Sequence, residues 1–383
     1  MGAHKMLPTT LHDELAQQSF VLSLKQHISA NITPGNHKIY DGRVLPELRR
    51  KNGCVPNDRH EVRRAMEHDP YHQMWGSLMR LAQELMWDYV GECVDRQLDD
   101  LVERSKDEVQ PLGSLRLDKK LEQPRYLALV DQHAQPGSYY TETRPDDVRA
   151  GAVLDQGANL YHFGKNGGSI MDGRGRTLVA HLFERFPDFR PRRILDLGCS
   201  VGASTLPFVE FYPGADVYAI DTAAPLLRYA HGRAEGLGRA VHFAQQDAEA
   251  LDYPDESFDL VVSLVLLHET STHALPKIFH ECQRVLKPGG VVAHLEVPVR
   301  YKDMESLCEQ VLRDWQTYYN DEPFWGKVCE TDLVAVLEKL GFRDVEAGYQ
   351  KVTTNPRCRR SSTFSKVPDS RPGNWYIVSG VRS

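Results

Sequence analysis

Three aspartates follow successive short apolar segments and have the chemistry to hold one polar ligand. Asp196 precedes a glycine-containing turn, and Asp221 and Asp247 follow the next two apolar segments. A carboxylate at the position of Asp221 can accept hydrogen bonds from both hydroxyls of a ribose. One at Asp247 can accept a hydrogen bond from an exocyclic adenine amine. Open parallel sheets bind ligands at the carboxyl ends of their strands, so we expect the three acids to line one site.

The turn after Asp196 has the composition of a ligand-binding loop. It spans residues 198–202 and leads into a predicted helix. Gly198 permits a sharp turn of the backbone, and Gly202 permits close approach of a ligand or helix. Cys199 is expected to be a small buried residue and not a redox centre. Dinucleotide-binding folds have similar turns, so the three acids indicate the site more specifically than the glycines do.

The elements that position these residues alternate regularly after Gly175. We expect strands at 193–197, 216–220, 241–245, 258–263, 290–296, 345–349 and 375–381. Continuous apolar strands separated by helices predict an α/β fold with a doubly wound, mostly parallel, seven-stranded sheet. No helix is expected between the last two strands, which indicates an antiparallel hairpin at the edge of the sheet.

The segment 194–298 resembles the class I S-adenosylmethionine-dependent methyltransferases. Their first motif, Asp/Glu-x-Gly-x-Gly-x-Gly, is matched by Asp196, Gly198 and Gly202, with Ser200 at the middle glycine. Segments 253–261 and 284–290 are similar to the approaches to the family's fourth and fifth strands. The resemblance implies a Rossmann-like methyltransferase fold, S-adenosylmethionine as cofactor and S-adenosylhomocysteine as product. It also implies that the cofactor contacts Asp196, Gly198, Cys199, Ser200, Gly202, Asp221, Thr222, Asp247, Ala248 and Leu264.

Candidate catalytic residues follow the fourth and fifth predicted strands. His268 and Glu269 follow the fourth, where this family often places residues that face the acceptor. His268 can act as a general base, because its ordinary pKa is near 6.5, or it can order the loop; Glu269 can orient it. Glu296, near the end of the fifth strand, is expected to line the acceptor pocket. His294 shares that face and is expected to be a core histidine.

The regions around this core indicate how the acceptor would be held. We expect a mainly helical N-terminal region, 1–150, that caps the acceptor pocket and can form homodimer contacts, followed by a methyltransferase domain, 151–383. In the first region, helices are predicted over 71–104, with a break near Gly91, and over 121–131. The cofactor is expected to be covered by Tyr139, Tyr140, Tyr161, His162 and Phe163. A lid-like insertion, 299–330, is rich in aromatic residues. A basic connection, 351–373, either binds an acidic group of the acceptor or is a solvated loop, which we favour.

Composition excludes several classes of protein. The net charge of −7, from 46 basic and 53 acidic residues, gives no reason to expect a nucleic-acid partner. The seven scattered cysteines do not form a disulfide framework, and no Cys/His spacing suggests zinc, so no metal is expected. No apolar run approaches the roughly 20 residues of a membrane span, and the first residues lack a signal-peptide core. These features predict a cytoplasmic protein without a membrane partner.

Together these features predict an enzyme, an S-adenosylmethionine-dependent methyltransferase. A sulfonium methyl group is already activated, so the protein must mainly align a nucleophile with it and exclude water. The acidic charge and aromatic additions favour a small organic acceptor of natural-product type, with O- or C-methylation preferred. A protein or RNA methyltransferase is one alternative and would require an open or basic surface. A non-catalytic scaffold that keeps the fold is the other.

Overall fold

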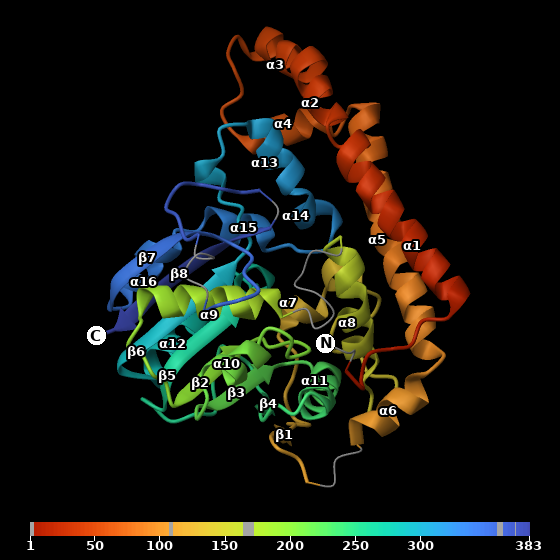
Figure 1. Cartoon of the computed structure of the whole chain (residues 1–383). Coiled ribbons are helices and arrows are strands. Elements are labelled where there is room, and N and C mark those ends of the chain that lie inside the picture. Colours follow the sequence, from red (N-terminus) through yellow and green to blue (C-terminus); the bar gives the residue numbers. More distant parts are fainter. Residues whose placement is uncertain (1–3, 107–109, 164–171, 358–362, 372) are drawn as a thin grey trace.

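An eight-stranded sheet forms the centre of the molecule (Figure 1). The structure is a computed structural model that describes residues 4–106, 110–163, 172–357, 363–371 and 373–383. The strand order is β1-β4-β3-β2-β5-β6-β8-β7. The strands are β1 (Ser114–Arg116), β2 (Arg193–Leu197), β3 (Asp216–Asp221), β4 (His242–Gln245), β5 (Phe258–Leu264), β6 (Leu286–Glu296), β7 (Phe342–Lys351) and β8 (Asn374–Arg382).

The predicted fold class is confirmed, with one addition to the sheet. All seven predicted strands are present, and β8 pairs antiparallel with both β6 and β7. The additional strand, β1, comes from the N-terminal region and pairs in parallel with β4. The expected number of seven was therefore too low, because a three-residue strand with a single apolar residue, Leu115, gives too short a pattern to recognise.

Strand β2 lies at the point where the sheet reverses its winding order. It pairs in parallel with β3 on one side and with β5 on the other. Because consecutive residues of any strand point to opposite faces of the sheet, neighbouring β2 residues pack on different sides. Leu195 packs in one apolar cluster with Phe279, and Ile194 packs in the other with Leu182. Both faces are thus buried, and the open crevice is left at the carboxyl edge of the sheet, as expected for a doubly wound fold.

The helices that cover the sheet alternate with its strands, as predicted. They are α9 (Gly173–Arg185), α10 (Leu206–Phe211), α11 (Ala224–Gly236), α12 (Ala274–Val285) and α16 (Leu333–Lys339). The remaining α-helices are α1 (His12–His27), α2 (Gly35–Ile39), α3 (Leu45–Asn52), α4 (Arg59–Met66), α5 (Pro70–Asp95), α6 (Leu98–Lys106), α7 (Arg125–Ala128), α8 (Arg149–Tyr161), α13 (Leu307–Arg313), α14 (Trp315–Tyr319) and α15 (Trp325–Glu330). Short π and 3₁₀ turns are η1 (Ile28–Ile32), η2 (Tyr40–Val44), η3 (Gln132–Ala134), η4 (Leu267–Glu269) and η5 (Tyr301–Asp303).

Helix α5 is the long support of the N-terminal region and runs beside α1 (Figure 1). It begins after Asp69, whose side chain accepts from the backbone of Tyr71, with Pro70 in the first turn. A break near Gly91 was expected, and this was wrong: the helix continues to Asp95, since its buried face stays packed past the glycine. A predicted helix over 121–131 is also much shorter in the structure and is confined to α7.

Helix α8 connects the N-terminal helices to the sheet. It packs against α5 on one side and α11 on the other. The approach to α5 is close: a Cβ atom on Gly157 would lie 2.5 Å from the ring of Trp87. The division into regions 1–150 and 151–383 stays a prediction, and α8 spans that line.

The insertion folds onto the N-terminal region. Helix α13 packs against α4, and α14 against α5 (Figure 1). Arg59 of α4 bonds through Nε to Asp314 Oδ2 at 3.0 Å and through Nη1 to Glu330 Oε1 at 2.6 Å. Asp314 is 2% exposed and also accepts from the hydroxyl of Tyr301. The two additions therefore share a buried ion pair.

We predict that the variant Arg59→Met lowers the free energy of unfolding by about 3 kcal/mol, because it leaves Asp314 buried without a counter-charge. Urea unfolding would measure the loss. Arg313→Met is the matched control, since its pair with Glu309 is partly exposed and should contribute less than about 1 kcal/mol. Equal losses for the two variants would contradict the assignment.

Candidate functional site

A cavity of about 1030 Å³ opens at the carboxyl ends of β2, β3 and β5. It extends from the sheet edge to the N-terminal helices and the insertion. The predicted site residues that line it are Asp196, Gly198, Cys199, Ser200, Asp221, Thr222, Asp247, Ala248, Leu264, His268 and Glu269. Of the predicted residues, only Gly202 and Glu296 are outside the lining, and Glu296 lies directly behind it. The predicted site residues therefore line or adjoin one cavity.

Asp196, at the end of β2, carries a carboxylate that the protein satisfies only in part. It is 1% exposed, and Oδ2 accepts from the Thr205 hydroxyl at 2.6 Å. Its other oxygen, Oδ1, has no hydrogen-bond partner among the described residues. Burial raises the pKa of Asp196 to about 7. A ligand that brings an amino group would supply the missing partner.

The turn after β2 has the backbone that its glycines predicted. Gly198 and Gly202 have φ values of +66° and +72°. A Cβ atom on Gly198 would lie 2.6 Å from Leu266, so this turn is pressed against the loop that follows β5. Ser200 also has a positive φ, 51°, which costs a non-glycine residue about 1–2 kcal/mol. That cost explains why glycine is the family's choice at its position.

Asp221, at the end of β3, is held in place by backbone donors. Its Oδ2 accepts from the N–H of Ser200 at 2.9 Å, and its Oδ1 from the N–H of Ala223 at 3.0 Å. Burial raises the pKa of this carboxyl. A carboxylate has about four acceptor sites, so this one can still accept from a ligand hydroxyl beside these backbone donors.

Asp247 and Thr222 complete the part of the cavity lined by Asp196 and Asp221, which we name the cofactor side after the predicted role of these residues. Asp247 Oδ1 accepts from the N–H of Glu249 at 2.9 Å, so this aspartate also caps the turn that follows β4. Burial raises the pKa of Asp247 as well. The carbonyl of Thr222 accepts from the side chains of Gln245 and Gln123, at 2.9 and 2.7 Å. Gln123 belongs to the N-terminal region, which therefore reaches the cofactor side.

His268 lies in the part of the cavity lined by Glu269 and Trp325, which we name the acceptor side after its predicted role, and is fixed by Glu296. Its Nδ1 is 2.7 Å from Glu296 Oε2, while Glu296 Oε1 accepts from the N–H of Leu267 at 2.6 Å. Burial lowers the pKa of His268, but the charge and hydrogen bond of Glu296 and the charges of Glu269 and Glu322 together outweigh it and raise the pKa to about 9. The ring is therefore mainly charged at neutral pH, which favours hydrogen-bond donation. The general-base role of His268 stays a prediction.

Other expectations for this edge of the sheet have clear structural counterparts. His294 is fully buried, bonds to Ser263 at 2.8 Å and has its pKa lowered to about 3 by burial, as a core histidine should. The aromatic residues expected to cover the site do line the cavity: Tyr139, Tyr140, Tyr161, His162 and Phe163. In the basic connection, Lys366 and Arg371 pair with Glu346 and Asp369, while Arg359 and Arg360 lie outside the described residues.

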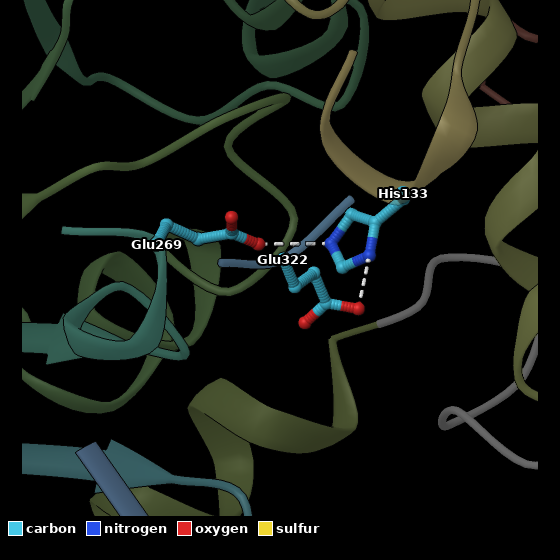
Figure 2. Close-up of side chains that lie close together, drawn as sticks. All are labelled: His133, Glu269 and Glu322. Carbon is cyan, nitrogen blue, oxygen red and sulfur yellow. Dashed lines mark hydrogen bonds and ion pairs between the residues drawn. The ribbon is translucent and has the colours of Figure 1, made fainter. Parts of the chain in front are cut away.

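Several cavity residues could not be found from the sequence. His133, in η3, and Glu322, in the insertion, meet Glu269 on the acceptor side (Figure 2). Arg174 of α9 lines the cavity, and its Nε has no hydrogen-bond partner among the residues that the structure describes. Burial lowers the pKa of Arg174. Lys25 of α1 lies 5.0 Å over the ring of Tyr161, and burial lowers its pKa to about 7. None of them has a local sequence signal, because each is brought here by tertiary packing.

Known methyltransferases are similar to this chain over the strands and helices that carry the cavity. Residues 194–290 match the family model described as a methyltransferase domain. A trans-aconitate 2-methyltransferase from Methylobacterium radiotolerans is 36% identical over 211 residues, which are 53% of this chain and 74% of that protein. A demethylmenaquinone methyltransferase from Thermus thermophilus is 40% identical over 121 residues, 32% of this chain and about half, 54%, of that protein.

Among solved structures, phosphoethanolamine N-methyltransferase 2 of Haemonchus contortus, in complex with S-adenosyl-L-methionine, is 21% identical. The match covers 60% of this chain and 57% of that one, with a TM-score of 0.41.

The chain belongs to the class I S-adenosylmethionine-dependent methyltransferases. The cofactor of that family fits the residues present. The unpartnered Asp196 Oδ1 suits its amino group, and the Asp221 carboxylate suits its ribose hydroxyls. Among the described residues, no helix has the length and apolar character needed to cross a membrane.

We predict that Asp221→Ala weakens binding of S-adenosylhomocysteine by about 10- to 100-fold, since two hydrogen bonds to a charged acceptor are lost. Isothermal titration calorimetry measures this directly. Asp216→Ala is the matched control, because Asp216 is exposed at the other end of the same strand. If both variants bind like the parent, Asp221 does not hold the ribose.

We also predict that cofactor binding depends on pH through Asp196. The amino group pairs with the ionised carboxylate, and that form is lost as the pH falls through about 7. The Kd for S-adenosylhomocysteine should therefore rise between pH 7 and pH 5.5, approaching about tenfold per unit. Asp196→Asn should bind more weakly and with a flatter profile. An unchanged slope in this variant would contradict the prediction.

Proposed function

We propose that this chain transfers the methyl group of S-adenosylmethionine to a small organic acceptor. The observation that carries the proposal is that one continuous cavity contains both the cofactor side and the acceptor side. It begins at the cofactor residues on the sheet edge and continues between the N-terminal helices and the insertion. Its volume of about 1030 Å³ is at the upper end of small-molecule pockets, which suits a cofactor together with a compact acceptor.

The walls of the cavity beyond the cofactor side support an enclosed acceptor. Trp325 and Trp315 come from the insertion, and Tyr139 and Tyr161 from the N-terminal side. Such walls exclude water and hold the acceptor in line with the methyl group. A macromolecular acceptor would instead need an open face for its chain.

The chemical step requires little beyond alignment and the removal of a proton. The acceptor oxygen or carbon forms a bond to the methyl carbon while the carbon–sulfur bond breaks, and its electron pair returns to sulfur as S-adenosylhomocysteine leaves. A hydroxyl or carbon nucleophile must also lose a proton. Glu269 is proposed to receive it, and His268 can do so only in its minor neutral form, because its pKa is raised to about 9. Glu296 is proposed as a positioning residue, because it bonds to both His268 and the backbone of Leu267.

The relatives support this acceptor class without naming the acceptor. The protein from Methylobacterium radiotolerans is named for trans-aconitate and that from Thermus thermophilus for demethylmenaquinone, and both names describe small molecules. The alternative of a scaffold that has lost catalysis has less support, since Asp196, Asp221 and Asp247 are all in place around the cavity.

The proposal is tested by incubating the purified chain with S-adenosylmethionine and a panel of carboxylic acids, phenols and quinols. Mass spectrometry should detect S-adenosylhomocysteine and a methylated product with at least one class, and Asp221→Ala should lose most of this turnover. A tRNA fraction and a protein lysate are parallel arms. Turnover with one of these alone, or a parent protein that does not bind S-adenosylmethionine in calorimetry, would overturn the proposal.

A further inference from the structure

His133, Glu269 and Glu322 come from three distant segments and meet on the acceptor side of the cavity (Figure 2). His133 Nε2 lies 2.9 Å from Glu269 Oε1, and its Nδ1 lies 2.8 Å from Glu322 Oε1. One ligand atom from each residue can be chosen so that all three lie within 4.8 Å of one another. All three residues line the cavity, so a small ion can reach them.

Glu322 provides a second, independent observation. The residue is 1% exposed, and its Oε1 is already used by His133 and by Asn320 Nδ2 at 2.7 Å. Its other oxygen, Oε2, is buried without a hydrogen-bond partner among the described residues and lies 3.8 Å from His268 Nε2. The positive charge of His268 is beyond hydrogen-bond distance of this oxygen. A buried carboxylate oxygen without a donor is unfavourable, so a cation bound directly to this atom would satisfy it.

The position of His133 is set by the helix behind it. Its carbonyl oxygen accepts from Trp87 Nε1 at 2.8 Å and from Gln83 Nε2 at 3.0 Å, both on α5. The Tyr161 hydroxyl lies 3.1 Å from Nδ1. Packing therefore fixes the position of the His133 ring. A metal ligand must be fixed in this way if the site is to favour one coordination geometry.

We propose that His133, Glu269 and Glu322 bind one divalent transition-metal ion of the series from Mn²⁺ to Zn²⁺. An imidazole favours transition metals over Mg²⁺ and Ca²⁺, and two carboxylates favour divalent ions over soft monovalent copper. Three protein ligands leave coordination positions for other groups. Because the cluster faces the cavity, a hydroxyl or carboxylate oxygen of the acceptor can fill such a position; this part rests on the proposed function.

The absence of a metal was expected from the sequence because no short Cys/His spacing is present. A spacing of this kind reveals only metal ligands that are close together in the sequence. Here the three ligands lie in η3, in η4 and in the insertion, and only the fold brings them together.

The test uses tag-free full-length protein, treated with EDTA and desalted. Calorimetric titration with Zn²⁺ and with Mn²⁺, and with Mg²⁺ for comparison, should show about one equivalent of a transition metal bound with a Kd below about 10 µM. Glu322→Gln and Glu269→Gln should each weaken binding by about 10- to 100-fold. His37→Gln is the matched control and should bind as the parent does, because His37 forms a partly exposed pair with Glu309 at 3.3 Å.

The titration of the unmodified protein decides the matter even if a variant fails to fold. No binding of Zn²⁺ or Mn²⁺ by the parent at about 100 µM, or equal affinity in a folded Glu322→Gln, would show that the cluster is only a hydrogen-bonded network and would overturn the metal site. S-adenosylhomocysteine is titrated into the same preparations. If S-adenosylhomocysteine binds and the metals do not, the metal site fails and the proposed function stands. If a metal binds and S-adenosylhomocysteine does not, the proposed function fails and the metal site stands.

Discussion

The backbone N–H of Ser200 donates to Asp221 over 2.9 Å, and this bond joins the glycine turn of β2 to the end of β3. It is possible only because β2 and β3 run in parallel with their carboxyl ends together. The same alignment places β5 on the other side of β2, where Leu266 presses against Gly198. The cofactor side of the cavity therefore follows from strand direction: if β2 paired with either neighbour in the opposite sense, these residues would lie at opposite edges of the sheet.

The acceptor side depends on a different kind of constraint. No strand carries His133 or Glu322, and their place is set by the packing of the N-terminal region against the insertion. Arg59 and Asp314 hold these two additions together through a buried ion pair. Glu296 is the link back to the sheet, because it ends β6 and bonds to both the backbone and the side chain of the η4 loop. Thus the sheet presents one wall of the cavity and the additions close the other.

This difference explains what could be predicted from the sequence. Asp196 and Asp221 follow apolar strands in a short pattern, so their shared edge was predictable from local periodicity and strand direction. The long-range partners were not, since Arg174 and His133 have nothing around them in sequence that indicates a cavity. Strand β1 was missed for a related reason, because its pairing with β4 is decided by tertiary contact rather than by its three residues. The break expected at Gly91 failed because the helix face remains buried there, and packing overrides the weak preference of glycine against helices.

The unpartnered groups of the cavity carry both signs of charge, and their arrangement follows the division into two sides. Asp196 Oδ1 lies on the cofactor side, Glu322 Oε2 on the acceptor side, and Arg174 Nε also lacks a partner. Each of these atoms was removed from water when the chain folded, and none has a hydrogen-bond partner among the described residues. A cofactor with ammonium and carboxylate groups has the opposite charges for Asp196 and Arg174, so its binding relieves a cost that the fold alone leaves in place. Ligands that bind only the folded chain stabilise it by mass action. Stability and specificity are therefore set by the same groups: the residues that make the empty cavity unfavourable are those that select what enters it.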